Sequence, residues 1–323
     1  MNKPIAIIAG EPNSIASEII FKSWLLRKKY KHKPFFIIGN IKLLNKQKKK
    51  LKLKVKILEI NNKPFEQNIK NDNLLVYNVD YEQKKPFDLI SNKSNKYIFK
   101  CFDVAIKLAL YKKIVGIINC PVSKDYLFKN KHQGITEFLS KKTGEKGNEV
   151  MLIFNSKLSV SPITTHISLK KVSSEIKKNN IIKKVKIINS FYKKILKLKP
   201  KFGILGLNPH NFTHFEKAEE KIIILKAINI LKKLKIKVSG PIPTDSSFMY
   251  HNRKKFDVIV GMYHDQVLTP FKAIYNYKAI NITLGLPFIR ISPDHGVARD
   301  IVGKKIADPT SMIESIKFFN NIK

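Results

Sequence analysis

The sequence is poor in cysteine and has no long apolar segment. Only Cys101 and Cys120 occur in 323 residues, which excludes a disulfide framework and favours a reducing compartment. No run approaches the ~18 apolar residues that a membrane helix needs. The first apolar run, residues 5–9, is also shorter than the core of a signal peptide. We therefore expect a cytoplasmic protein that contacts no membrane.

Arginine is scarce although the chain is strongly basic. The formal net charge is +38, but of the 62 basic residues only Arg27, Arg253, Arg290 and Arg299 are arginine. A basic surface is typical of nucleic-acid binding, yet such sites favour the bidentate fork of arginine. The lysines are spread along the whole chain together with many Ile and Asn residues, as an AT-rich genome would produce. We therefore expect no nucleic-acid partner, and a basic nucleic-acid-binding protein is the alternative from another class.

Glycine-rich segments are missing as well. No Gly-x-Gly-x-x-Gly occurs, which excludes the Rossmann dinucleotide fingerprint. No Pro/Gly/Ser-rich linker interrupts the chain, so two domains would have to be joined by crossing strands rather than by a flexible tether. Hydrophobic residues make up 43% of the sequence, which is enough for a sizeable core.

Short apolar runs alternate with segments of helical periodicity. Strands are predicted at 5–10, 35–39, 74–79, 114–120, 150–154, 202–208, 256–261 and 279–285, and helices at 97–113, 181–199 and 216–234. The Lys-rich segment 42–56 is predicted to be an exposed helix or loop that leads into a strand. This alternation predicts an α/β fold with a largely parallel sheet and helices on both faces.

Three segments share one layout, in which an apolar strand is followed by a short polar step that ends in histidine. They are "VSPITTH" ending at His166, "GILGLNPH" at His210 and "VIVGMYH" at His264. The carboxyl ends of strands in one parallel sheet open into a shared crevice. Three imidazoles with an open position would form a catalytic metal site, and imidazole favours zinc or a similar transition metal. A lone histidine at a strand end is usually only a hydrogen-bonded loop residue, so the hypothesis depends on all three together.

The C-terminal third contains longer motifs that point to a family. "YHDQ" (263–266), an isolated Lys272, "NITLGLPFIR" (281–290) and "DHG" (294–296) resemble the 4-hydroxythreonine-4-phosphate dehydrogenase family of vitamin B6 synthesis. The resemblance continues in order along the chain, in "GEP" (10–12), "GITEFL" (134–139), "EVML" (149–152), "TTHISL" (164–169), "GLNPH" (206–210) and "GPIPTD" (240–245). It covers nearly the whole sequence.

Residues 295–309 carry a second, wider resemblance. "HGVARDIVGKKIADP" is similar to the loop of isocitrate and isopropylmalate dehydrogenases that cradles the adenosine of the cofactor. The resemblance implies NAD, with NADP as an alternative, bound in a non-Rossmann manner. It assigns cofactor binding to His295, Gly296 and Asp308, although Gly296 is equally well explained by loop structure.

The family resemblance also implies an architecture and a ligand set. It implies two α/β/α lobes around a central cleft, isocitrate/isopropylmalate dehydrogenase-like, with residues 1–125 and 285–323 in one lobe and 126–284 in the other. The metal ligands of the family fall on His166, His210 and His264. The third ligand comes from the partner subunit in the family, which implies a homodimer with shared active sites. Zinc is the favoured metal, with magnesium or cobalt as alternatives.

The substrate contacts of the family fall on Thr136, Lys272, Asn281 and Arg290. The planar guanidinium of Arg290 suits a carboxylate or phosphate better than lysine does. Asp245 and Asp265 would support the shell of residues around the metal. Together with Lys272 they are the predicted catalytic residues. The implied reaction is the NAD-dependent oxidation and decarboxylation of 4-phosphooxy-L-threonine to 3-amino-2-oxopropyl phosphate, CO2 and NADH.

The sequence departs from the family pattern at three places. Ile135 replaces a substrate-binding histidine, and the lost contact corresponds to ~1–3 kcal/mol of transition-state binding. The family's "GEPAGIG" reads "GEPNSIA" (10–16), and a glycine-rich loop after His210 is replaced by "NFTHF" (211–215). The alternatives that remain open are a paralogous dehydrogenase of a phosphorylated sugar acid such as 4-phosphothreonate, and an inactive dimeric relic.

Overall fold

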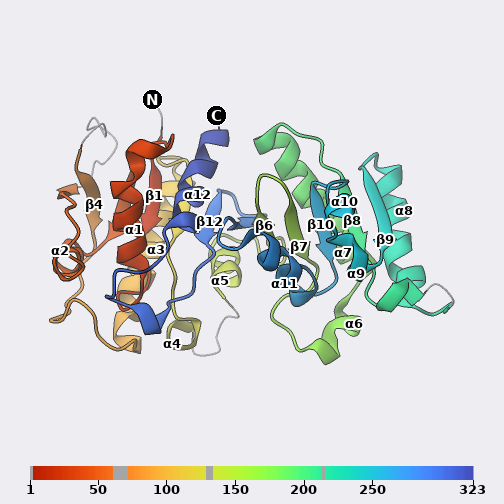
Figure 1. Ribbon diagram of the computed structural model, residues 1–323, viewed down its shortest axis with the longest axis horizontal. Coiled ribbons are helices and arrows are strands. Elements are labelled where there is room, and N and C mark those ends of the chain that lie inside the picture. Colours follow the sequence, from red (N-terminus) through yellow and green to blue (C-terminus); the bar gives the residue numbers. More distant parts are fainter. Residues whose placement is uncertain (1–2, 61–71, 129–133, 213–214, 323) are drawn as a thin grey trace. The chain divides into compact units, whose positions relative to one another are not determined.

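The computed structural model describes residues 3–60, 72–128, 134–212 and 215–322, and it divides the chain into two compact units (Figure 1). Unit 1 comprises Met1–Gly144 and Leu286–Lys323, and unit 2 comprises Glu145–Gly285. The first boundary therefore lies at 144/145 and not near the expected 125/126. The reason is that Leu127, Phe138 and Leu139 pack in the hydrophobic core of unit 1.

Unit 1 contains a sheet whose described strand pairs are all parallel. Its spatial order is β3 (Ile57–Ile60), β4 (Leu74–Asn78), β2 (Phe35–Gly39), β1 (Ile5–Ile8), β5 (Gly116–Asn119) and β12 (Arg290–Pro293). Every residue of β1 is buried, as expected for a parallel strand that is covered on both faces. The predicted strands in this half of the chain are confirmed.

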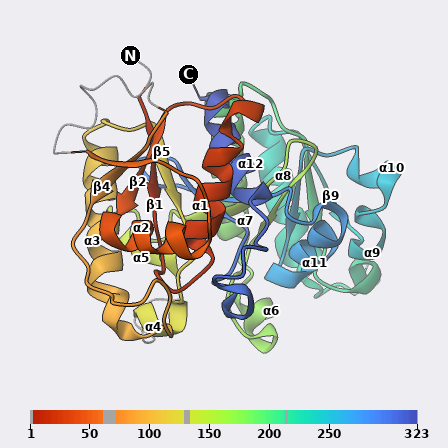
Figure 2. The same ribbon diagram turned by 60° about the vertical axis from the view of Figure 1, so that its left-hand side comes forward.

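Helices cover both faces of this sheet (Figures 1 and 2). The helices of unit 1 are α1 (Ala16–Leu25), α2 (Ile41–Lys50), α3 (Asn95–Leu110), α4 (Lys124–Phe128), α5 (Ile135–Lys142) and α12 (Thr310–Phe318). Helix α3 packs on the face formed by Ala6 and Ile8, while α1 contacts α2 and α12. The predicted Lys-rich helix is α2, whose first turn is capped by Asn40: its side chain accepts a hydrogen bond from Leu43 N at 2.9 Å.

The sheet of unit 2 is mixed. Its order is β11 (Ile280–Leu284), β6 (Val150–Phe154), β7 (Ser159–Pro162), β10 (Val258–Gly261), β8 (Phe202–Leu205) and β9 (Val238–Ile242). Strand β6 runs antiparallel to β11 and β7, whereas β7, β10, β8 and β9 are parallel. The short connection between β6 and β7 allows only an antiparallel pair, because a parallel pair needs a long crossover.

The longer helices of unit 2 position the loops at the strand ends. They are α7 (Lys178–Phe191), α8 (Leu225–Lys233) and α11 (His264–Tyr275), with the short helices α6 (Val172–Glu175), α9 (Thr244–Ser247) and α10 (Tyr250–Arg253). Helix α11 packs on β7 and β10 through a cluster that includes Val160, Ile259, Val267 and Phe271. This contact fixes the start of α11 at the end of β10.

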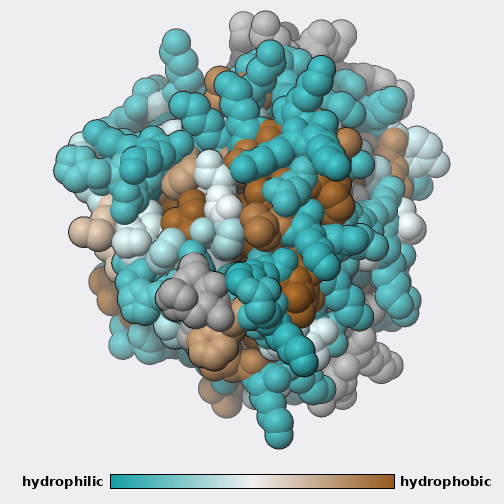
Figure 3. All heavy atoms as spheres, turned by 90° about the vertical axis from the view of Figure 1, so that its right-hand side faces the viewer, coloured by the Kyte–Doolittle hydropathy of each residue, from teal (hydrophilic) through white to brown (hydrophobic). Residues whose placement is uncertain are grey.

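Within the described ranges, no helix combines the length and the apolar composition that a bilayer crossing requires. The face in Figure 3 is covered mostly by hydrophilic side chains, with separate apolar patches between them.

Truncation of the core beneath α11 tests this packing. Phe271 is fully buried, so Phe271→Ala is expected to lower the free energy of unfolding by about 3–5 kcal/mol through lost burial and a residual cavity. Urea denaturation measures this change. Leu198→Ala is the control, since Leu198 is 57% exposed and its truncation should cost less than about 0.5 kcal/mol. Equal effects of the two substitutions would contradict the described core.

Candidate functional site

The three predicted histidines follow three neighbouring parallel strands of unit 2. His166 lies after β7, His210 after β8 and His264 at the start of α11, directly beyond β10. Strand β10 pairs in parallel with both β7 and β8, so the three carboxyl ends lie at one edge of the sheet. The layout inferred from sequence therefore corresponds to adjacent strand ends.

His166 and His264 lie side by side at this edge. Their ring centroids are 5.7 Å apart. Two imidazoles that bind one tetrahedral ion through metal–nitrogen bonds of about 2.0–2.1 Å have ring centroids roughly 5 Å apart. His166 also has a left-handed backbone with φ of 49°, a conformation that is uncommon outside glycine and concentrates at functional positions. The two rings are thus close to a shared-ion geometry.

His210 does not join this pair within one chain. Its side chain is 85% exposed, and its Nδ1 lies 3.9 Å from Oδ2 of Asp245. Its φ of 51° and that of the following Asn211, 62°, are both left-handed. Across the described segments, no group of three or more His, Cys, Asp or Glu side chains is arranged to hold a metal ion. A single chain therefore assembles two of the three expected ligands.

Carboxylates face the Nδ1 atoms of two of these histidines. Nδ1 of His264 lies 2.9 Å from Oδ1 of Asp265, and Nδ1 of His210 faces Asp245. A carboxylate on one ring nitrogen fixes the tautomer and leaves the other nitrogen for a metal. Nε2 is therefore the coordinating atom that this arrangement favours in both residues.

Gln266 connects the strand ends and was not identified from sequence. It is 5% exposed, and its Oε1 accepts a hydrogen bond from Met262 N at 2.6 Å. Its Nε2 donates to the carbonyl of Gly206 at 2.7 Å and to Oγ1 of Thr244 at 2.8 Å. One side chain thus joins the segments that carry His264, His210 and Asp245. Its position in "YHDQ" was the only available signal.

Glu220 organises the loop before His210 and was also missed. It is 2% exposed, and its Oε1 accepts hydrogen bonds from the backbone N–H groups of Leu207 and Asn208 at 2.7 and 2.8 Å. Its Oε2 accepts from Nδ2 of Asn208 at 3.1 Å. Because Glu220 lies in a periodic, charged helical segment, its pattern is the same as that of a residue on a solvated helix face.

Lys272 and Asn281 lie on different elements of unit 2. Lys272 is exposed on α11, eight residues after His264, which corresponds to a rise of about 12 Å along the helix. Asn281 lies on β11, paired with Ile153, and its buried Oδ1 has no hydrogen-bond partner among the described residues. A buried acceptor of this kind suits a donor group of a ligand.

Arg290 begins β12 in unit 1 and is only 3% exposed, which excludes its interpretation as an ordinary surface arginine. Its Nε donates to Oδ1 of Asn119 at 2.5 Å. Desolvation by burial lowers the pKa of Arg290 to about 10, and the negative charge of Glu137 opposes this shift. Arg290 therefore remains a cation at neutral pH, held in a fixed orientation by Asn119.

Thr136 and Ile135 form the first turn of α5. Thr136 is half-buried, whereas Ile135 is 5% exposed and belongs to the hydrophobic core of unit 1. The isoleucine that replaces the family histidine thus has a packing role and supplies no polar group to a ligand.

The predicted cofactor loop in unit 1 leaves space at Gly296. An added Cβ at Gly296 would meet no atom within 4 Å, and the φ of this residue is not left-handed. Neither packing nor backbone conformation therefore requires glycine at this position, and the space beside it is open. His295 precedes it and is half-buried. The carbonyl of Val297 accepts a hydrogen bond from Ile15 N at 3.3 Å, which ties this loop to the start of α1.

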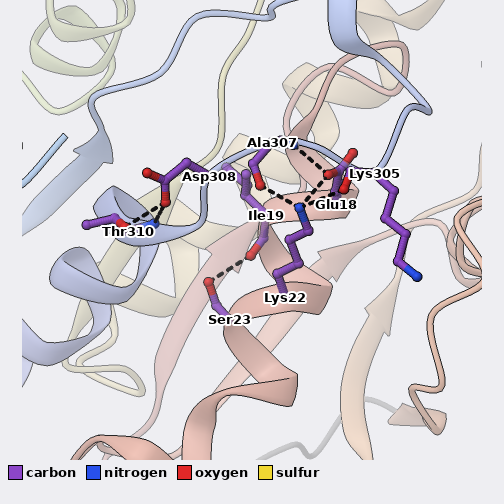
Figure 4. Close-up of polar contacts among 8 residues, drawn as sticks. All are labelled: Glu18, Ile19, Lys22, Ser23, Lys305, Ala307, Asp308 and Thr310. Atoms are coloured by element: carbon purple, nitrogen blue, oxygen red, sulfur yellow. Dashed lines mark hydrogen bonds and ion pairs between the residues drawn. The ribbon is translucent and has the colours of Figure 1, made fainter. Parts of the chain in front are cut away.

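Asp308 is held at the other end of the same loop (Figure 4). Its Oδ1 accepts hydrogen bonds from Thr310 N at 2.8 Å and from Thr310 Oγ1 at 2.6 Å. Its Oδ2 takes no part in these bonds. The residue is exposed, so its carboxylate is fixed locally and accessible.

The altered residues of the "GEPNSIA" segment cause no backbone strain. Ser14 and Ala16, which replace family glycines, do not have a left-handed φ. Oγ of Ser14 donates to the carbonyl of Glu11 at 2.7 Å and accepts from Ala16 N at 3.1 Å. The neighbouring Glu11 is 2% exposed, and burial raises its pKa against hydrogen bonds from Asn13 and Ser94. This loop therefore tolerates the loss of both glycines. The third departure, "NFTHF", lies partly outside the described residues at 213–214.

Comparison with known proteins gives consistent matches. The family model "Pyridoxal phosphate biosynthetic protein PdxA" matches residues 31–319. A 4-hydroxythreonine-4-phosphate dehydrogenase of Sulfurihydrogenibium sp. is 40% identical over 97% of this chain and 96% of that protein. A protein of Oceanobacillus iheyensis with the provisional name D-threonate 4-phosphate dehydrogenase is 34% identical over 97% of this chain and 96% of its own length.

Solved structures show the same fold. The 4-hydroxythreonine-4-phosphate dehydrogenase of Klebsiella pneumoniae superimposes with a TM-score of 0.87 at 29% identity, over 100% of both chains. An isocitrate dehydrogenase of Methylococcus capsulatus gives a TM-score of 0.51 at 12% identity, over 99% of this chain and 85% of that one, and this likeness concerns the fold alone. The predicted α/β, isocitrate dehydrogenase-like fold is confirmed.

Removal of the Gln266 amide tests how the strand ends are held together. Gln266→Leu keeps the approximate size but leaves Met262 N, Gly206 O and Thr244 Oγ1 without this partner. The free energy of unfolding should fall by about 2–4 kcal/mol, because buried polar groups are left unsatisfied. Thr269→Leu, at an exposed position of the same helix, is the control and should change it by less than about 0.5 kcal/mol. A Gln266→Leu protein as stable as the control in urea denaturation would rule out this role.

Proposed function

The chain belongs to the pyridoxal phosphate biosynthetic protein PdxA family, and we propose that it works in vitamin B6 synthesis as a 4-hydroxythreonine-4-phosphate dehydrogenase. The family is one of oxidoreductases, and the match extends over nearly the whole chain. The substrate would be 4-phosphooxy-L-threonine, which is the same compound as 4-hydroxy-L-threonine 4-phosphate. The products would be 3-amino-2-oxopropyl phosphate, CO2 and NADH.

The observation that carries the proposal is the pairing of His166 and His264 at the carboxyl edge of the unit 2 sheet. Their 5.7 Å separation and the carboxylate on Nδ1 of His264 fit the requirements of a metal ligand set. His166, His264 and His210 would hold a divalent ion, zinc first, with magnesium or cobalt as alternatives. The ion would act as a Lewis acid that lowers the pKa of the substrate C3 hydroxyl and stabilises negative charge on that oxygen.

NAD, or alternatively NADP, would bind at the 295–309 loop of unit 1 and accept the hydride from C3. Its fit is supported by the open space at Gly296, which leaves room for an adenosine to approach the backbone. Asp308 would accept hydrogen bonds from the ribose hydroxyls, since its carboxylate is fixed by Thr310 while Oδ2 is not used in those bonds. His295 would line the same position.

Polar residues in each unit suit the charged ends of the substrate. Arg290, buried and cationic, suits the carboxylate or phosphate, and Thr136 would add a hydroxyl contact. The buried Oδ1 of Asn281 would accept a hydrogen bond from the amino group. Lys272 lies about 12 Å along α11 from His264, which favours a role as a charge that holds a distant anionic group over proton transfer at C3.

Decarboxylation would follow from the product of the first step. Oxidation at C3 gives a β-keto acid, and cleavage of the C2–carboxylate bond releases CO2 while the electron pair moves to the C3 oxygen as an enolate. Protonation at C2 then gives the amino ketone. Asp245 and Asp265 would keep the imidazoles oriented during both steps. The activation barrier would be lower because the groups that stabilise the developing negative charge are already in position.

A homodimer would complete the ligand set. One chain brings His166 and His264 together, while His210 stands apart beside Asp245. In a two-fold dimer, a histidine that is distant within one chain can meet the pair of the other chain. In sequence order the third ligand of the family is His264, but the pairing of His166 with His264 in one chain favours His210 as the ligand from the partner subunit.

The second candidate function is oxidation of 4-phosphothreonate or a similar phosphorylated sugar acid. The relative from Oceanobacillus iheyensis favours it, as does the apolar Ile135 in place of a family histidine. This substrate has a hydroxyl where the first has an amine, and the buried Oδ1 of Asn281 can accept from either group.

Replacement of the histidines tests the metal site. His166→Ala, His210→Ala and His264→Ala should each lose stoichiometric metal and reduce NADH production by at least about 100-fold, since the loss of a ligand removes Lewis-acid activation. Metal content is measured by plasma mass spectrometry and activity by absorbance of NADH. His251→Ala, an exposed histidine of α10, is the control and should change neither.

Mixing inactive variants tests the shared ligand. Equal amounts of His166→Ala and His210→Ala chains, exchanged into mixed dimers, should regain up to about a quarter of normal activity, because half of the dimers are mixed and each has one intact site. If no pairwise mixture of the three variants recovers activity, the ligands do not come from two subunits. Normal metal content and activity in His210→Ala would contradict the ligand set itself.

A direct assay separates the two candidate substrates. With NAD and zinc, 4-phosphooxy-L-threonine is expected to give NADH with a kcat/KM at least about tenfold above that for 4-phosphothreonate, a difference of about 1.4 kcal/mol in transition-state binding. The products are identified by mass spectrometry. A reversed ratio would assign the chain to the second function. Absence of turnover with both substrates would identify the protein as an inactive relic of the family.

A further inference from the structure

Two side chains of α1 hold the cofactor loop immediately before Asp308. Glu18 and Lys22 lie one helical turn apart, so they share a face of α1 (Figure 4). We propose that they are positioning residues for NAD: they fix residues 305–307, and through them Asp308, in the conformation that binds the adenosine half. The inference rests on the proposed use of NAD.

Glu18 and Lys22 together bind both backbone groups of Ala307, its N–H and its carbonyl. Oε1 of Glu18 accepts a hydrogen bond from Ala307 N at 2.7 Å. Nζ of Lys22 donates to the carbonyl of Ala307 at 2.6 Å and to that of Lys305 at 3.1 Å. The two side chains are also joined to each other, with Nζ of Lys22 2.8 Å from Oε1 of Glu18. The pair therefore binds the backbone of the loop and not its side chains.

Burial makes these contacts strongly interdependent. Glu18 is 1% exposed and Ala307 2% exposed, while 21% of the Lys22 side chain remains accessible. Oε2 of Glu18 is buried and has no hydrogen-bond partner among the described residues, so Oε1 makes both contacts. Removal of Lys22 would leave a buried carboxylate without its counter-charge, and removal of the carboxylate would leave Ala307 N without its acceptor.

The position of Asp308 follows from this anchor. Lys305 has a left-handed φ of 62°, so the chain turns sharply just before the anchored residues. On the other side, Oδ1 of Asp308 is bound by Thr310 at the start of α12. Asp308 is thus fixed from both directions, by α1 through Ala307 and by α12 through Thr310. A loop ordered before binding loses less conformational entropy when the ligand arrives.

Ser23 on the same helix provides a control for substitutions that affect only the stability of α1. Oγ of Ser23 donates to the carbonyl of Ile19 at 2.7 Å, and Ser23 is fully buried (Figure 4). This hydrogen bond lies entirely within α1. Ser23→Ala therefore removes a buried polar contact next to Lys22 without altering the contacts to 305–307. Lys317→Met is a second control, which removes one positive charge from an exposed pair with Glu314 on α12.

The experiment compares Lys22→Met and Glu18→Gln with these controls in the full-length, metal-loaded protein. NAD affinity is measured by calorimetry, and the KM values for NAD and for the phosphorylated substrate are measured separately. Hydrogen exchange of the peptide that covers 303–309 reports the loop without any ligand. We expect Lys22→Met to raise the Kd for NAD at least about tenfold, which is about 1.4 kcal/mol, to accelerate exchange at 303–309, and to leave the substrate KM within about twofold. Glu18→Gln should act in the same direction.

Each other outcome overturns the inference in a recognisable way. Unchanged exchange at 303–309 would show that the pair does not hold the loop. Faster exchange with normal NAD affinity would show that the anchor does not position the cofactor. A similar loss of NAD affinity in Ser23→Ala would show that the effect comes from a general loss of stability in α1. If the unmodified protein binds no NAD, the proposed cofactor is wrong as well, and this result is obtained before any variant is made.

Discussion

The parallel alignment of β7, β10 and β8 is the constraint on which the site depends. Parallel strands bring their carboxyl ends to one edge, so residues separated by 44 and 54 positions in the sequence begin neighbouring loops. Gln266 then joins the loops by hydrogen bonds to Met262, Gly206 and Thr244. Two of these loops contain a histidine with a left-handed backbone, at His166 and at His210.

Much of the fold was predictable because buried parallel strands are short apolar runs. The eight runs identified from sequence are strands of the structure, and helices form at the three predicted segments. Strands β9 and β12 were missed because "VSGPI" and "RISP" contain proline and polar residues that resemble turns. The unit boundary was misplaced because nothing in the sequence of α4 and α5 shows which core their apolar residues join.

The histidines of the candidate site could be picked out from the sequence, but the contacts that surround them could not. Repetition of the strand–histidine layout identified three imidazoles, and structure places two of them side by side. Gln266, Glu220 and Asn119 were not recognisable, because a buried amide or carboxylate that binds backbone groups has the same sequence appearance as a surface residue. Such contacts depend on three-dimensional neighbours, and no local periodicity encodes them. The distance of His210 from the other two rings was equally hidden.

The candidate residues are distributed over the two units. Unit 2 carries the three histidines with Asp245, Asp265 and Lys272, and unit 1 carries Arg290 and the 295–309 loop. In the "GEPNSIA" segment, Ser14 forms local hydrogen bonds with Glu11 and Ala16. Ile135 packs in the hydrophobic core of unit 1. These two departures from the family pattern are therefore accommodated within unit 1.

X-ray absorption spectroscopy of the zinc-loaded protein tests the central claim most directly. Three imidazole nitrogens at about 2.0–2.1 Å, together with one or two oxygen ligands, are the expected first shell. In His210→Ala, zinc that still binds when it is added in excess should show imidazole scattering lower by about one third. A zinc ion surrounded only by oxygen ligands, or histidine variants whose zinc spectra are identical to that of the unmodified protein, would contradict a metal site built from these strand ends.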